Sequence, residues 1–213
     1  CGASTKVKPK LYAIFFLDKM RQKSYIKQQY REVFVYLSES KKFIWFSAGF
    51  FLFSIIVGFL FPIFFVDFVR QAMADMLASV NGLGLFGLIT HILMNNLGIG
   101  FLQIISGVFF GIFPLISLLF NGYAIGFISN FVVSEAGLSS LWLLIPHGIF
   151  ELPAIILSMA LGIRIGFFIF SKNRAFELSK RFILSLKTFI FVIIPLLILA
   201  AIIEGFLITF FTN

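Results

Sequence analysis

The chain has 213 residues, of which 60% are hydrophobic, 12% are charged and 32 are phenylalanine, a composition that excludes an ordinary water-soluble domain and predicts an integral membrane protein. The formal net charge is +8, but the basic residues flank apolar segments instead of forming a stripe with interleaved aromatic residues, so we expect no nucleic-acid binding. A single cysteine excludes a disulfide framework and a zinc site built from thiolates.

Residues 1–42 form a basic segment that holds ten of the 17 lysine and arginine residues. Because such residues stay on the cytoplasmic side of a neighbouring span, we expect the amino terminus inside the cell. Imperfect apolar periodicity over residues 11–37 predicts an amphipathic helix. It lies either along the inner leaflet, held by anionic lipid, or against the protein's own cytoplasmic loop. We therefore divide the chain into this cytoplasmic or interfacial segment and a transmembrane domain, residues 43–213.

Five apolar segments are long enough to cross a bilayer, which takes about 20 residues of helix. In chain order they are residues 43–66, 83–110, 114–133, 141–170 and 186–211. Between the first two, residues 67–80 carry apolar side chains at helical spacing. This pattern predicts a short helix on the outer membrane surface, with a surface for docking a partner as the alternative.

Charges between the spans predict the orientation. Residues 172–187 carry five lysine and arginine residues, whereas the outer loops carry only Arg70. The excess of positive charge on cytoplasmic loops then places the amino terminus inside and the carboxyl terminus outside. The predicted fold is an all-α integral membrane protein with about five transmembrane helices.

The fourth span, residues 141–170, contains Pro146 and Pro153. Each proline removes a backbone hydrogen bond to the carbonyl four residues earlier. Thirty residues is also long for one crossing. We therefore expect a fourth helix that is broken at a proline, or residues 141–151 as a re-entrant half-helix that precedes the true crossing.

Polar residues from three spans are expected at one depth, about 10–18 Å below the outer boundary at about 1.5 Å per residue. This intramembrane polar layer consists of His91, Asn95, Asn96, His147, Glu151 and Glu204. A deeper level holds Asn121 and Arg164. Single histidines and asparagines in a membrane most often form structural hydrogen bonds between helices, whereas two buried carboxyl groups are harder to explain by packing alone.

Three pairs of glycines spaced four residues apart predict close helix packing, either within one chain or at a homodimer face. The pairs are Gly107 with Gly111, Gly122 with Gly126, and Gly162 with Gly166.

We expect no enzymatic activity, metal or cofactor. The HExxH, GxSxG, paired-aspartate and P-loop motifs are absent from the sequence. His147, Glu151 and His91 could hold a divalent metal by ligand type alone, but no nucleophile and base stand together.

The chain resembles the stage II sporulation protein M family in several motifs, which occur in the same order as in that family. They are the Asn95–Asn96 pair, Asn121-Gly122 followed by Gly126, and His147-Gly148 with Glu151, all within residues 36–166. The resemblance implies a multi-pass cell-membrane protein with about five spans. In spore-forming bacteria the namesake acts with peptidoglycan-degrading partners at the septum, as a membrane scaffold and not as the hydrolase. Members also occur in organisms that do not form spores.

The leading functional hypothesis is a non-enzymatic membrane scaffold that recruits or positions envelope-remodelling partners. Its partners would be the lipid bilayer and membrane or envelope proteins, including peptidoglycan hydrolases if the source is bacterial. The alternative is a permease, or the membrane subunit of a transporter, with Glu151, Glu204, His147 and Arg164 along a substrate or proton path.

Overall fold

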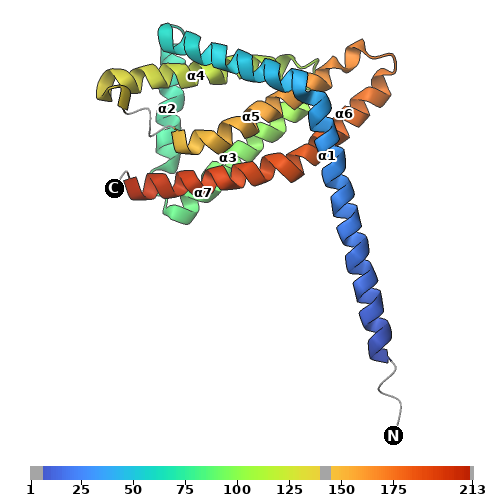
Figure 1. Ribbon diagram of the computed structural model, residues 1–213. Coiled ribbons are helices and arrows are strands. Elements are labelled where there is room, and N and C mark those ends of the chain that lie inside the picture. Colours follow the sequence, from blue (N-terminus) through green and yellow to red (C-terminus); the bar gives the residue numbers. More distant parts are fainter. Residues whose placement is uncertain (1–6, 140–144, 212–213) are drawn as a thin grey trace.

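The computed structural model describes residues 7–139 and 145–211, which are helical almost throughout and contain no strand (Figure 1). The helices are α1 (Val7–Leu60), α2 (Val66–Val80), α3 (Leu85–Ser106), α4 (Ile112–Ala136), α5 (Ile145–Gly166), η2 (Phe167–Phe170), α6 (Arg174–Thr188), η3 (Phe189–Ile193) and α7 (Ile194–Phe211). Five helical stretches in the described part are long and apolar enough to cross a membrane. The predicted all-α membrane fold with five spans is therefore confirmed, while the orientation of the termini stays a prediction.

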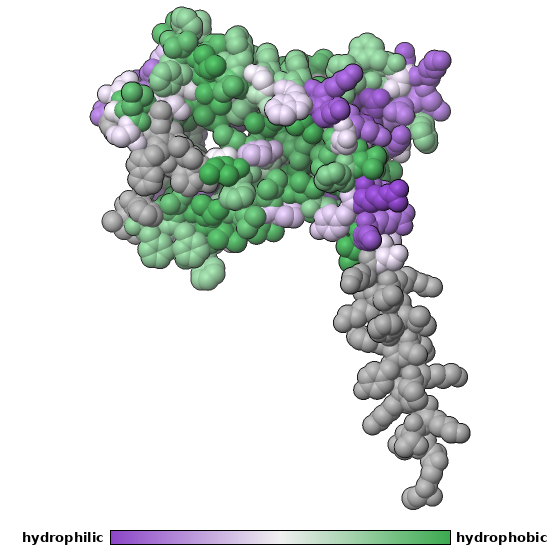
Figure 2. Space-filling view, viewed as in Figure 1, coloured by the Kyte–Doolittle hydropathy of each residue, from purple (hydrophilic) through white to green (hydrophobic). Residues whose placement is uncertain are grey.

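The spans α3, α4, α5 and α7 run alongside the second half of α1 to form the bundle, and α2 lies across one end of it (Figure 1). At the other end α6 leads through η3 into α7, and the first half of α1 projects away from the bundle. Hydrophilic residues gather at this second end, whereas the visible flank of the bundle is mostly hydrophobic (Figure 2). The molecule thus has one strongly polar end and an apolar girdle suited to lipid.

Helix α1 runs without interruption from Val7 to Leu60 but bends between its projecting half and its bundle half (Figure 1). We call residues 7–39 the arm. The carbonyl oxygen of Tyr36 accepts hydrogen bonds from Ser40 Oγ (2.7 Å) and from Arg164 Nη1 (2.7 Å). Side chains that compete for a helical carbonyl weaken the backbone ladder and bend helices. Polar contacts at Tyr36 can therefore bend α1 without a proline.

The central helix is α5: in its most apolar stretch of 18 residues 56% are buried inside the protein, against 22–33% in the same stretch of the other four spans. It contributes Leu161 and Ile165, both fully buried, to a core that also contains Ile104 of α3 and Leu197 of α7. Large apolar side chains on the outer faces of the surrounding helices stay exposed, as expected for surfaces that meet lipid.

Glycine allows the helix backbones to touch at two interfaces. A methyl group at Gly126 of α4 would collide with the Ile55 carbonyl of α1, and one at Gly122 would lie 2.7 Å from Ser54 Cβ. Between α3 and α5, side chains at Gly107, Gly111, Gly162 and Gly166 would likewise press on backbone or side-chain atoms of the facing segment. All six predicted packing glycines thus lie at helix contacts within the chain.

Pro153 lies inside α5, which runs from Ile145 to Gly166 as one helix. The expectation of a proline-broken or partly re-entrant fourth span is therefore not confirmed, and residues 140–144 lie outside the described part. A proline at this position forfeits one backbone hydrogen bond, to Ile149. Transmembrane helices tolerate this loss when neighbouring helices pack around the site, as they do around the fully buried Ala154.

The helix predicted between the first two spans is present as α2, and its place on the outer membrane surface stays a prediction. Val69 is buried against Tyr123 and Phe127 of α4, whereas Phe68 and Met76 stay exposed. The Tyr123 hydroxyl holds the turn before α2, because it contacts the carbonyl oxygens of Phe61 and Phe64 at 2.9 Å and accepts from the Phe64 amide. Tyr123 is not among the residues for which the sequence predicted a role.

Candidate functional site

Two glutamates meet inside the bundle. The Glu151 carboxyl group of α5 lies within side-chain hydrogen-bonding reach of Glu204 of α7 and Asn96 of α3. Asn96 is 5% exposed and Glu204 is 9% exposed. Two carboxyl groups can hydrogen-bond to each other only when one of them carries a proton. We call Glu151, Glu204 and Asn96 the carboxyl cluster.

Small residues bring the three helices of this cluster together. Gly205 follows Glu204, and a methyl group there would collide with the Ile89 side chain of α3. One turn along α3 from Asn96, a methyl group at Gly100 would lie 3.1 Å from Ser158 Oγ of α5. Because both neighbours are glycines, α5 and α7 approach α3 closely enough for short polar side chains to meet.

The rest of the predicted polar layer does not join the cluster. His91 Nε2 lies 3.0 Å from Ser79 Oγ of α2, so the His91 ring faces α2. Asn95 is exposed, on a different face of α3 from Asn96. The side chain of His147 lies outside the described part of the structure. The structure therefore assembles three of the six predicted residues.

A second polar cluster joins the arm to α5 and α6. Arg164 of α5 donates from Nη1 to the Tyr36 carbonyl and to Ser40 Oγ, and from Nη2 to Glu39 Oε2 (2.9 Å). Its guanidinium carbon also lies 4.0 Å from the centre of the Tyr36 ring, in cation–π geometry. The Tyr36 hydroxyl donates to the Arg181 carbonyl oxygen (3.1 Å) on α6. We call these residues, together with Ser185, the clamp.

Further contacts tighten the clamp. The hydroxyls of Tyr36 and Ser185 lie 2.9 Å apart in a buried hydrogen bond, and Arg181 Nη1 donates to the Arg164 carbonyl oxygen (3.0 Å). These contacts join α1, α5 and α6 to one another. The clamp therefore fixes the place where the arm leaves the bundle.

The two residues of the predicted inner level have different partners. Arg164 belongs to the clamp, whereas Asn121 donates to the carbonyl and the hydroxyl oxygen of Ser117 (2.8 and 3.0 Å). Gln103 of α3 donates to the same hydroxyl (2.8 Å). Asn121 thus supports the α3–α4 contact and does not extend the Arg164 network.

No group of three or more histidine, cysteine, aspartate or glutamate side chains gathers in metal-binding geometry within the described residues. The carboxyl cluster offers two carboxylates and an amide. Its chemistry suits proton sharing or structural hydrogen bonding between helices.

The family model described as "Stage II sporulation protein M" matches residues 42–208. The chain belongs to the stage II sporulation protein M family. An uncharacterized protein of Methanocaldococcus jannaschii is 37% identical over 76 residues, which cover 35% of this chain and 43% of that protein. The aligned region thus spans less than half of this relative. No solved structure gives a significant match to the chain.

The region matched to the stage II sporulation protein M family contains the whole carboxyl cluster and Arg164. The arm, by contrast, precedes the matched residues, although the clamp residues that hold it on α5 and α6 lie within them. The clamp therefore joins the family bundle to a segment outside the family match.

Replacing Glu204 by leucine is expected to lower the thermal unfolding temperature in detergent. The change removes one of the two partners of the Glu151 carboxyl, and the loss of a hydrogen bond by a buried polar group costs about 1–3 kcal/mol. Glutamine can donate a similar hydrogen bond, so Glu204→Gln should retain most of the stability. Glu135→Leu serves as the control because Glu135 is exposed on another helix. Equal losses for Glu204→Leu and Glu135→Leu would contradict this account.

Proposed function

We propose that this member of the stage II sporulation protein M family is a non-enzymatic scaffold of the cell membrane that positions envelope-remodelling proteins. The observation that carries the proposal is the arm, a helix that projects beyond the bundle and is fixed at its base by the clamp (Figure 1). A fixed projecting helix presents side chains to other molecules at a defined place. The expected partners are membrane or envelope proteins, with peptidoglycan hydrolases as the candidates in a bacterial source.

The surface of the arm supports a binding role. Ile26, Tyr30 and Phe34 follow one another at four-residue spacing, and 49–77% of each side chain is exposed. Residues at this spacing lie on one face of a helix. An exposed apolar row next to basic residues is typical of helices that bind a membrane surface or another helix.

Photocrosslinking tests the scaffold directly. A photoreactive amino acid at Phe34, on the arm, is expected to capture specific proteins in native membranes, which mass spectrometry of the adducts would identify. The matched control carries the same amino acid at Phe101, an exposed position within the α3 span, where lipid should be the main adduct. Absence of protein adducts at Phe34 above the level seen at Phe101 would argue against the scaffold.

The carboxyl cluster favours a second candidate, a permease or transporter subunit. A pair of carboxyl groups that shares one proton inside a membrane protein is a common element of proton pathways. The protein in liposomes would then move protons or a coupled substrate, and Glu204→Gln should abolish the flux while Glu135→Gln leaves it intact. If the scaffold proposal is right, wild-type liposomes should leak no faster than empty ones in the same pH-sensitive dye assay.

A further inference from the structure

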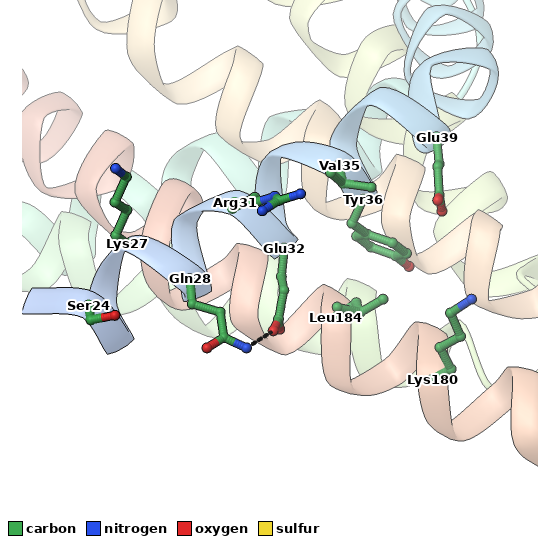
Figure 3. Close-up of a pocket in the computed structure, with 10 residues that line it drawn as sticks. All are labelled: Ser24, Lys27, Gln28, Arg31, Glu32, Val35, Tyr36, Glu39, Lys180 and Leu184. Carbon is green, nitrogen blue, oxygen red and sulfur yellow. Dashed lines mark hydrogen bonds between the residues drawn. The ribbon is translucent and has the colours of Figure 1, made fainter. Parts of the chain in front are cut away.

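A pocket of about 650 Å³ lies in the angle between the arm and α6 (Figure 3). Most of its lining comes from one face of the arm, including Lys27, Arg31 and Glu32, and the facing wall includes Lys180 of α6. This volume falls within the range of about 300–1,000 Å³ that small-molecule sites occupy. Most of the pocket therefore belongs to the arm, which precedes the residues matched to the family.

The charges around the pocket are unbalanced. Both carboxylates in its wall already have cationic partners, since Glu32 pairs with Lys187 (2.6 Å) and Glu39 pairs with Arg164 (2.9 Å). The three cations Lys27, Arg31 and Lys180 make no ion pair within the described part of the chain. The pocket therefore presents three positive charges without counter-charges, which is an arrangement that attracts an anion.

The pocket also lies beside the boundary of the apolar bundle. The Tyr30 ring packs edge-on against Phe191 of η3, with the ring centres 5.1 Å apart, so the arm runs next to the start of the fifth span. The exposed apolar row of Ile26, Tyr30 and Phe34 occupies a face of the arm other than the one that lines the pocket. Helices that lie at a membrane surface combine an apolar row with cations on a neighbouring face, and those cations then meet the lipid headgroups.

We propose that this pocket binds the phosphate group of an anionic phospholipid of the inner leaflet. Arg31 supplies a planar guanidinium that can hold two phosphate oxygens, and Lys180 adds an ammonium donor from the α6 wall. The chemical group recognised is the phosphodiester of the lipid, which carries one negative charge. This assignment of a ligand goes beyond the scaffold proposal and does not depend on it.

Native mass spectrometry of the full chain in detergent, titrated with phosphatidylglycerol or with phosphatidylcholine of the same acyl chains, tests the site. The variant Lys27→Gln/Arg31→Gln/Lys180→Gln is expected to bind phosphatidylglycerol at least about tenfold more weakly than the wild type. Phosphatidylcholine binding should be unchanged. Thermal unfolding of each variant checks that the bundle is intact, which we expect because the altered side chains make no ion pair among the described residues.

The matched control is Lys41→Gln/Lys172→Gln/Arg174→Gln, which removes the same charge from exposed positions outside the pocket. It should bind phosphatidylglycerol as the wild type does. An equal loss in both triple variants would overturn the proposal, because it would mean general attraction to a basic surface. Displacement of the lipid by millimolar inorganic phosphate would also overturn it and assign the pocket to a soluble phosphate. Wild-type binding by the pocket variant would exclude an anionic ligand here.

Discussion

Replacing Gly126 by alanine is expected to destabilise the bundle by about 3 kcal/mol, the upper end of the usual cost of overpacking a core. The added methyl group would collide with the Ile55 carbonyl oxygen and would lie 2.7 Å from the backbone nitrogen of Phe59. Both atoms belong to the α1 backbone, so no side-chain rotation can relieve the overlap, and the helices must separate. Thermal unfolding in detergent measures the loss.

Gly49→Ala is the matched control for this prediction. Gly49 also lies in a span, on α1, but a methyl group there would meet nothing within 4 Å. Because alanine favours a helix over glycine by about 1 kcal/mol, this variant should be as stable as the wild type or slightly more so. If Gly126→Ala unfolds at the same temperature as Gly49→Ala, the close approach of α1 and α4 is wrong.

Replacing Arg164 by methionine is expected to release the arm from the bundle. The arginine side chain is only 12% exposed, and its loss removes hydrogen bonds to the Tyr36 carbonyl, Ser40 and Glu39. Bonds to a charged donor are worth about 1.5–3 kcal/mol in favourable cases. Spin labels at Phe34 on the arm and Phe176 on α6 should give one narrow distance distribution in the wild type and a broad one in Arg164→Met.

Two controls separate the clamp from a general effect of charge. Lys172→Met removes an exposed cation near the same end of the bundle and should leave the distance distribution narrow. Glu39→Gln removes an ion-pair partner that is 52% exposed, and Arg164 keeps its other two acceptors, so only slight broadening is expected. Broadening by Lys172→Met equal to that of Arg164→Met would show that the clamp does not fix the arm.

The five spans could be predicted because a helix that crosses a bilayer must be long and apolar. Runs of this kind can be recognised from the hydropathy of the sequence alone. The glycine pairs could be found for a related reason, since small residues four apart mark where backbones touch. The continuity of α1 across residues 37–43 was not predicted. Polar residues and Lys41–Lys42 suggested a boundary there. The Ser40 hydroxyl instead donates to the Tyr36 carbonyl oxygen of the same helix, and α1 continues to Leu60.

The candidate site could be predicted only in part because counting residues gives depth but not rotation about the helix axis. Asn96, Glu151 and Glu204 share a depth and also face one another. His91 was placed at nearly the same depth, yet it points toward Ser79 on α2. The clamp was not predicted because its contacts join residues as much as 149 positions apart, such as Tyr36 and Ser185. The spacing of residues within one segment does not indicate contacts of this kind.

The extensive contact between α1 and α4 has a consequence for biosynthesis. Gly58 of α1 fits against the backbone of Tyr123, so the first span rests on the third, and the second packs instead on α5 and α7. The ribosome completes α2 and α3 before α4 emerges. Until then the surface of α1 around Gly58 lacks its native partner on α4. The first and longest helix therefore reaches its native neighbours only after the second span, which does not pack on it, has been made.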